Sequence, residues 1–393
     1  MDKRLIVAMA ILTITFIGFG IIIPIMPEIV MAAATSNYEL HNGAILATYS
    51  LVSLLVSPIW GTLSDKVGRK KIIVVGLLGF ASSFLLFGLA IDHLALMYVA
   101  RALGGLFSGA VTSVIVAYVA DITSAENRTK GMALVGISIG FGFMIGPSVG
   151  GMLSVISYTT PFFVASALAV MTSMFALFIL QESRTVEERR AYKKQSRWKA
   201  FSGPTKYLYV LAFFVTFTLA FIEATLQYFG IIRFAVTPFE VGILFLICGL
   251  AGALVQGGVV RRKVKPGQEP KFIIAGLFIS SLGFFLLLNA HSFWFACLSL
   301  MIFGIGNSIA RPCVTSLITL KTKVGQGLAS GLSTSMDSLG RIAGPIIGSF
   351  LFTISIGLPY LIAGLLCLSV IIFVQLFKVA DYKDQQQAQI KAS

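Results

Sequence analysis

Apolar residues along the chain gather in long blocks that are separated by short polar segments. Twelve blocks are about 20 residues long or longer, the length that an α-helix needs to cross the hydrocarbon core of a bilayer. We predict helices over residues 5–27, 44–62, 72–91, 94–119, 131–153, 161–180, 207–229, 240–260, 271–289, 293–317, 326–354 and 358–377. The pattern therefore predicts an all-α integral membrane protein with twelve transmembrane helices.

The composition supports this prediction. Of 393 residues, 57% are hydrophobic and 12% are charged, whereas soluble domains average about 45–50% apolar and 25% charged residues. These values exclude an ordinary soluble enzyme. Three alanines at 32–34 resemble a signal-peptide cleavage site, but we interpret the first block as a spanning helix because it is long, contains Pro24 and Pro27, and precedes eleven more blocks.

The net charge of +14 would suit a nucleic-acid partner if the basic residues lined one surface. Of the 30 lysines and arginines, however, only Arg101, Arg311 and Arg341 fall in the interior of blocks, and Arg233 follows the seventh block. The other 26 lie at the N-terminus, in the even-numbered loops or in the C-terminal tail. By the positive-inside rule both termini are predicted to be cytoplasmic, and we expect no nucleic-acid partner.

The longest loop, 182–206, divides six blocks from six. We predict an N-terminal six-helix bundle at 1–181, a cytoplasmic linker at 182–206, a C-terminal six-helix bundle at 207–380 and a cytoplasmic tail at 381–393. The segment Gly142–Gly150 (GFMIGPSVG) matches Gly340–Gly348 (GRIAGPIIG), 198 residues later. The two halves are therefore predicted to be parallel repeats, which in transporters bind substrate near the midplane between them.

The cysteines and histidines give no sign of a metal site. All four cysteines fall inside apolar blocks without CxxC spacing, and the three histidines lie in or beside predicted external loops without ligand spacing. We expect no metal and no cofactor. The chain also lacks the GxxxxGK[ST] phosphate loop, which argues against an ATP-driven pump.

Glycine patterns mark two segments of the first half. The fifth block carries a GxxxGPxxGG pattern, in which glycines four apart permit close helix packing and the proline bends the helix. Its residues are Gly142, Gly146, Pro147, Gly150 and Gly151. The loop after the second block reads GTLSDKVGRKK and contains Gly61, Asp65, Gly68 and Arg69. We expect Gly61 to permit close helix contact and Asp65 to accept hydrogen bonds from a helix N-terminus, with Asp121 and Arg128 as flanking partners or as a solvated surface pair.

Together with Gly18–Pro27 and Arg101–Gly109, these segments resemble the signatures of the twelve-span drug:proton antiporters of the major facilitator superfamily, such as Gram-positive multidrug exporters. The resemblance implies the major facilitator fold and a hinge and seal formed by the fifth block. It also implies a conformational role for the loop motif and a proton-coupling role for Arg101. It further implies multidrug efflux, antibiotic resistance and a location in the bacterial cytoplasmic membrane.

Five charged residues lie in the interior of spans, where each charge costs about 2.5–3.5 kcal/mol on insertion scales. They are Arg101, Glu223, Arg311, Asp337 and Arg341. Glu223 has no basic residue nearby in the sequence, so it could bind a cation when ionised and release it when protonated, or stay protonated as a structural donor. The resemblance implies that Glu223 is the proton and drug site. Those exporters also carry an aspartate three residues before the Arg-Pro of span ten, where this chain has Ser308.

Asp337 and Arg341 are four residues apart and so share a helix face. They form either a self-contained ion pair or a second proton acceptor and a cavity charge. Three arginines within spans would also suit an anionic substrate. The candidate substrate-binding residues are Glu223, Arg311, Arg341, Asn307, Ser308, Phe16, Phe19, Phe141, Tyr228 and Phe303.

We therefore predict a monomeric transporter, not an enzyme, that exports lipophilic cationic or amphiphilic drugs in exchange for protons by alternating access. Its partners are small-molecule substrates, protons and the lipid bilayer. Two alternatives stay open at this point. One is an exporter of an endogenous anionic metabolite such as a carboxylate siderophore, and the other is a membrane receptor or scaffold that transports nothing.

Overall fold

The computed structural model describes residues 3–34, 36–123, 128–183, 201, 203–264, 267–322 and 326–392, and all regular structure within these residues is helical. The all-α prediction is therefore confirmed. The longer helices are α1 (Lys3–Ile21), α3 (Tyr38–Val67), α4 (Arg69–Leu89), α5 (Leu94–Ile122), α6 (Arg128–Ser154), α7 (Thr160–Ile179), α8 (Thr205–Phe234), α9 (Pro238–Val255), α11 (Glu269–Leu288), α12 (Phe293–Lys321), α13 (Gln326–Ile354) and α15 (Ile371–Ala392). The shorter helices are α2 (Met26–Ala33), α10 (Arg261–Lys263) and α14 (Leu358–Ser369), and a π-helical segment, Gln256–Val260, joins α9 to α10.

Several predicted helices differ from the structure by a few residues at their ends, and the first and last blocks differ in a further way. The first block breaks into α1 and α2 at a turn over residues 22–25, because Pro24 lacks a backbone N–H, and Pro27 lies in the first turn of α2. At the other end of the chain, α15 continues to Ala392 through the predicted polar tail. Lys321 Nζ lies 2.7 Å from an Asp381 carboxylate oxygen and anchors this extension to α12.

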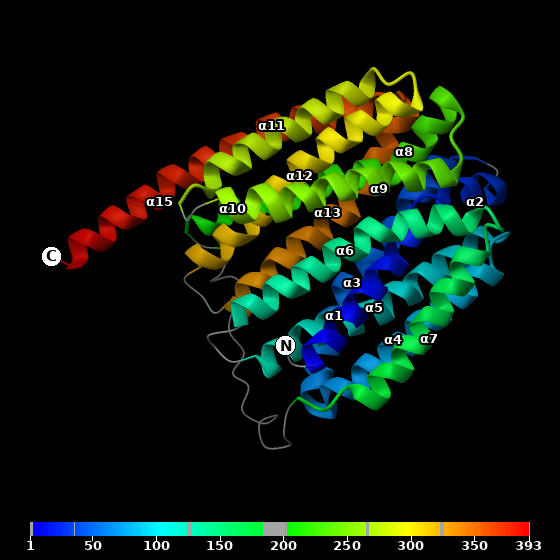
Figure 1. The fold of residues 1–393 in the computed structure, drawn as a ribbon, viewed down its shortest axis with the longest axis horizontal. Coiled ribbons are helices and arrows are strands. Elements are labelled where there is room, and N and C mark those ends of the chain that lie inside the picture. The colour runs from blue at the N-terminus through cyan, green and yellow to red at the C-terminus, as the bar shows by residue number, and fades with distance from the viewer. Residues whose placement is uncertain are drawn as a thin grey trace. The chain divides into compact units, whose positions relative to one another are not determined.

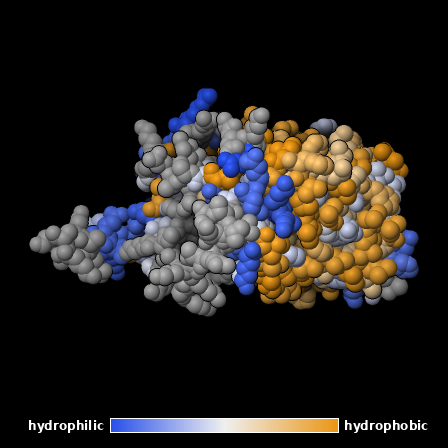
Figure 2. Space-filling view, turned by 90° about the horizontal axis from the view of Figure 1, so that it is seen from below, coloured by the Kyte–Doolittle hydropathy of each residue, from blue (hydrophilic) through white to orange (hydrophobic). Residues whose placement is uncertain are grey.

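Eleven helices of the described chain are long and apolar enough to cross a membrane. The predicted eleventh block, α13, is not among them although it has 29 residues, because Asp337, Arg341 and several serines make it more polar. Large apolar side chains cover the surface of the spans, and Phe178 and Leu254 are each more than 75% exposed. Figure 2 shows hydrophobic residues gathered in a broad band over the face in view, as expected for a surface that meets lipid.

The chain divides into two compact units (Figure 1). Unit 1 comprises residues 1–193 and 236–246, and unit 2 comprises residues 194–235 and 247–393. The first half of α9 belongs to unit 1 because it packs on α6, where Ser148 Oγ donates a hydrogen bond of 3.2 Å to the Gly242 carbonyl. The remainder of α9 packs within unit 2.

The same glycine seam recurs in each unit. In unit 1, a Cβ added to Gly146 of α6 would lie 2.7 Å from the Ile17 carbonyl oxygen of α1, and one on Gly150 would overlap the carbonyl oxygen of Ile21. In unit 2, a Cβ on Gly340 or Gly344 of α13 would lie 2.8 Å from a carbonyl oxygen of α8. Glycine is needed at these positions because the two backbones touch. The repeated sequence segments thus produce the same helix pairing.

Candidate functional site

Glu223 lies within α8, the most buried of the candidate membrane spans, and its side chain is 7% exposed. Arg341 of α13 reaches it from the neighbouring helix. One guanidinium nitrogen of Arg341, Nη1, lies 2.9 Å from Oε2 and 3.2 Å from Oε1 of Glu223. Two buried groups of opposite charge thus satisfy each other inside the membrane region, where an unpaired charge would be costly.

This contact corrects the picture of Glu223 as an isolated acid. The sequence near Glu223 contains no basic residue, but the seam between α8 and α13 brings Arg341 to it from 118 residues away. Gly340, the residue before Arg341, has its Cα so close to α8 that an added Cβ would lie 2.9 Å from the Phe217 backbone nitrogen. The glycine seam therefore positions the arginine.

Asp337 has partners on two other helices. Its Oδ1 accepts a hydrogen bond of 2.6 Å from Thr216 Oγ1 of α8, and its Oδ2 lies 3.6 Å from Arg311 Nη2 of α12. Its ion pair with Arg311 is about 30% exposed on both sides, far more than the pair of Glu223 and Arg341. Of the two alternatives for Asp337 and Arg341, the self-contained pair is not the observed arrangement, because their ion pairs join α13 to α12 and to α8.

These four side chains form what we call the charged ladder of unit 2: Glu223, Arg341, Asp337 and Arg311. When all four are ionised, its two acids balance its two bases. Arg341 and Asp337 are one helical turn apart on α13, so Arg341 has a second carboxylate about one turn away on its own helix. Asp337 is therefore positioned as an alternative partner for Arg341.

The other candidate residues of unit 2 have varied surroundings. Phe303 is buried against Phe284, with 4.9 Å between ring centroids, so it packs inside the unit. Ser308 of α12 fills the space beside Gly252 of α9, while Asn307 is half-buried. Tyr228 is buried and its ring centroid lies 6.1 Å from that of Phe352. Their proposed contact with substrate stays a prediction.

Arg101 is a buried charge in the middle of a span of unit 1. It is 3% exposed on α5, and its guanidinium carbon lies 4.5 Å from the ring centroid of Tyr49 and 5.6 Å from that of Phe19. Its Nε and Nη2 atoms have no hydrogen-bond partner among the described residues. The aromatic faces stabilise the charge through cation–π attraction. Arg101 is thus a desolvated cation whose donors remain available.

The predicted aromatic residues of unit 1 separate into two environments. Phe19 contacts Phe143, with 5.1 Å between ring centroids, and Phe16 contacts the same ring at 4.9 Å. These rings form one cluster with Tyr49, which lies 5.0 Å from Phe19. Phe141, by contrast, is 50% exposed. The cluster beside Arg101 therefore includes Phe16 and Phe19.

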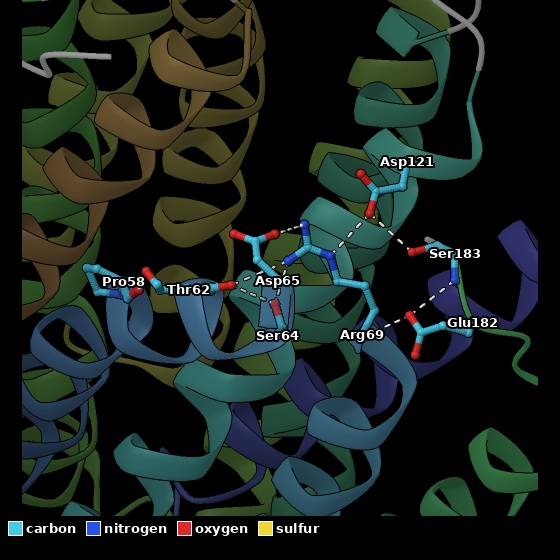
Figure 3. Close-up of polar contacts among 9 residues, drawn as sticks. Pro58, Thr62, Ser64, Asp65, Arg69, Asp121, Glu182 and Ser183 are labelled. Carbon is cyan, nitrogen blue, oxygen red and sulfur yellow. Dashed lines mark hydrogen bonds and ion pairs between the residues drawn. The ribbon is translucent and has the colours of Figure 1, made fainter. Parts of the chain in front are cut away.

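The loop motif forms a compact network around Arg69 at the start of α4 (Figure 3). Arg69 Nη2 lies 2.7 Å from Asp65 and its Nε lies 3.1 Å from Asp121 of α5. Its Nη1 also contacts Ser64 Oγ. Gly68, which precedes it, has a φ of 115°, a conformation that favours glycine. The Arg69 side chain, only 5% exposed, therefore ties α3, α4 and α5 together.

Two residues after α7 join this network and were missed from the sequence. The backbone N–H of Arg69 donates to Glu182 Oε1 at 2.8 Å, and Ser183 Oγ donates to Asp121 at 3.1 Å (Figure 3). The expected acceptor at the N-terminus of α4 was Asp65, but the side chain that caps this N–H is Glu182. Its distance of 113 residues from Arg69 hid the contact. The side chain of Arg128 and most of the predicted linker lie outside the described residues.

Gly61 does not act as expected. A Cβ there would meet no atom within 4 Å among the described residues, so close helix contact does not require this glycine. Its carbonyl oxygen instead accepts a hydrogen bond of 2.7 Å from Ser64 Oγ.

Replacing Glu182 by glutamine is expected to lower stability modestly. The change removes a negative charge from a helix N-terminus, a contribution of about 0.3–1 kcal/mol at an exposed site that salt screens. The apparent melting temperature should fall by about 1–2 °C at low salt and by less at 1 M salt. If the variant melted at the same temperature as the wild type at both salt concentrations, the carboxylate charge would contribute nothing to stability.

Charges that are buried among long apolar helices and paired across helices are typical of proteins that move solutes through membranes. The model of the Major Facilitator Superfamily matches residues 8–326 and 267–391 of the chain. The chain therefore belongs to the major facilitator superfamily. It is a multi-pass membrane protein and a transporter rather than an enzyme.

Two relatives from Bacillus subtilis (strain 168) are 31% identical to it. They are Multidrug resistance protein 2, over 89% of each chain, and Multidrug resistance protein 1, over 92% of this chain and 94% of the relative. Quinolone resistance protein NorA of Staphylococcus aureus is 27% identical, over 95% of this chain and 96% of its own. The predicted kinship with Gram-positive multidrug exporters is thus confirmed.

Solved structures show the same fold. The human organic anion transporter MFSD10 (TETRAN) matches with a TM-score of 0.72 at 22% identity, over 95% of this chain and all of the other. A bacterial homologue of the human lysosomal transporter Spinster matches with a TM-score of 0.70 at 14% identity, over 97% of this chain and 98% of the other. The major facilitator fold is therefore confirmed.

Proposed function

We propose that the protein exports lipophilic cationic or amphiphilic compounds across the bacterial cytoplasmic membrane in exchange for protons. The observation that carries the proposal is the buried pair of Glu223 and Arg341, 2.9 Å apart within the span region. The names of relatives that align over nearly the whole chain support a drug as cargo. In this proposal the protein works as a monomer with both termini in the cytoplasm.

The chemistry is a competition for one carboxylate. Ionised Glu223 can be neutralised by the guanidinium of Arg341, by the positive charge of a substrate or by a proton. A bound proton removes the attraction for the other two, so protonation on the outer side releases the substrate. After the proton leaves on the inner side, Arg341 holds the empty carboxylate until a new cation displaces it. Asp337, one turn from Arg341, offers the displaced guanidinium a second acidic partner.

The available energy is sufficient. One pH unit contributes about 1.4 kcal/mol per proton, and 100 mV contributes about 2.3 kcal/mol per charge moved. Together they support a substrate gradient of more than about a hundredfold when one net charge moves inward with each cycle.

Export of an anionic metabolite is the second candidate, and Arg101 favours it because its Nε and Nη2 donors lack partners among the described residues. Arg311 and Arg341 do not favour this candidate, because Asp337 pairs with Arg311 and Glu223 pairs with Arg341. This candidate predicts that neutralising the arginines stops transport while Glu223→Gln still binds substrate normally. A receptor or scaffold function would give no flux at all.

The deciding experiment is flux in proteoliposomes that contain the purified protein. An imposed pH gradient should drive uptake or release of ethidium-like dyes in the direction opposite to protons, and a protonophore should abolish the accumulation. A parallel assay with a radiolabelled carboxylate siderophore distinguishes the second candidate. Dye flux that ignores the pH gradient would contradict proton coupling, and no flux of either compound would contradict both transport proposals.

A further inference from the structure

Gln227 of α8 is a buried amide without a partner among the described residues. It is 3% exposed, and neither its Oε1 nor its Nε2 atom hydrogen-bonds to any residue in the described part of the chain. About 90% or more of buried polar groups in native proteins have a hydrogen-bond partner. Leucine or methionine would fill a similar volume at this position without burying two unsatisfied polar atoms. A role in packing alone therefore does not explain glutamine here.

The position of Gln227 connects it to the charged ladder. It follows Glu223 by four residues, so both lie on one face of α8, about 6 Å apart along the helix axis. The same face includes Thr216, which donates to Asp337, and Ala220, whose Cβ lies 2.6 Å from the Cβ position of Gly344. This face of α8 therefore carries a carboxylate with its guanidinium partner and, one turn further along, an uncharged donor and acceptor.

We propose that Gln227 is a specificity-determining residue that binds an uncharged polar group of the substrate. The inference rests on the function proposed above, in which the cationic group of the substrate binds Glu223. It adds a second contact, so the preferred substrates are lipophilic cations with a carbonyl, ether or amide group about 6 Å from the positive charge. A cation without such a group binds through Glu223 and apolar contacts alone and leaves the Gln227 amide unused.

The test uses a matched pair of ligands and the full-length protein in lipid nanodiscs. Both ligands are aryl-alkyl trimethylammonium ions, one with a ketone on the fourth carbon from nitrogen and the other with a methylene group there. Tetraphenylphosphonium serves as a cation without hydrogen-bonding groups. Dissociation constants are measured by titration calorimetry for the wild type, Gln227→Met and Gln227→Leu, so that one variant suffices if the other does not fold.

Thr218→Val is the matched control, because it also removes a buried polar group from α8. The hydroxyl of Thr218 donates back to its own helix, at the Phe214 carbonyl 3.0 Å away. The wild type and Thr218→Val should bind the ketone about three- to tenfold more tightly than the methylene analogue, the range for one hydrogen bond. Gln227→Met should bind the two equally, with its affinity for tetraphenylphosphonium unchanged within about twofold.

Three outcomes would overturn the inference: a wild type without preference for the ketone, a Gln227→Met variant that keeps the preference, or an equal loss of affinity for all three ligands. The last outcome would assign Gln227 a structural role. Failure of the proposed function is distinguishable, because Glu223→Gln would then bind tetraphenylphosphonium as tightly as the wild type does. A wild type that binds no cation would overturn both.

Discussion

Replacing Glu223 by glutamine is expected to abolish uphill drug export while the protein stays folded. The amide has nearly the same shape as the carboxyl group and can still accept a hydrogen bond from Arg341, which lies 2.9 Å away. It can neither carry a proton nor neutralise a cation. When one proton is exchanged for one monovalent cation, no net charge moves, and one pH unit supports about a tenfold gradient; the gradient exceeds about a hundredfold only when one net charge also moves inward across 100 mV. The variant should therefore give only the dye concentration ratio that protein-free liposomes reach under the same gradients.

The measurement is the steady-state dye ratio across proteoliposomes under an imposed pH gradient and membrane potential. Glu240→Gln is the matched control, because Glu240 belongs to unit 1 and accepts its hydrogen bonds from Thr237 at the exposed start of α9. This control should retain the wild-type ratio. If Glu223→Gln kept full coupled accumulation, Glu223 would not be the proton carrier, and Asp337 would become the leading candidate.

Much of the fold follows from local sequence, because each span must be an apolar helix long enough to cross the hydrocarbon core of the bilayer. A block of about 20 apolar residues meets this requirement by itself, so the predicted helices at 72–91 and 161–180 coincide closely with α4 and α7. Positions where an apolar block does not form one uninterrupted helix were harder to predict. The turn before α2 contains Pro24, and the extension of α15 carries Asp381, which contacts Lys321 of another helix.

The charged residues of the site could be identified but not paired. Burial of a charge is costly wherever it occurs, so Glu223, Asp337 and Arg341 stand out in any apolar block. Which acid meets which base depends on how separate helices pack, as for Glu223 and Arg341, which are 118 residues apart in the sequence. The i,i+4 spacing of Asp337 and Arg341 suggested a pair within one helix, but both residues bind partners on neighbouring helices. Thr216, Glu182 and Tyr49 were missed for the same reason.

The two ion pairs of the ladder are buried to different extents. Replacing Arg341 is therefore expected to lower the free energy of unfolding more than replacing Arg311. Arg341 and Glu223 are 12% and 7% exposed, so Arg341→Met should leave an uncompensated buried charge and lower the free energy of unfolding by about 3–5 kcal/mol. Arg311 and Asp337 are 33% and 28% exposed and 3.6 Å apart. Water can solvate the remaining Asp337, so Arg311→Met should cost only about 1 kcal/mol or less.

A double-mutant cycle separates the interaction energy of the Glu223–Arg341 ion pair from the contribution that the packing of the two long side chains makes to stability. Glu223→Gln combined with Arg341→Met removes both charges, so the double variant should be more stable than Arg341→Met alone by about 2 kcal/mol or more. Stability is measured by reversible denaturation in mixed micelles, with the same cycle at Asp337 and Arg311 as the comparison. Additive losses at Glu223 and Arg341 would mean that the short contact contributes no coupling energy. The arginine would then not compete with substrate for the carboxylate, because it would gain nothing by holding it.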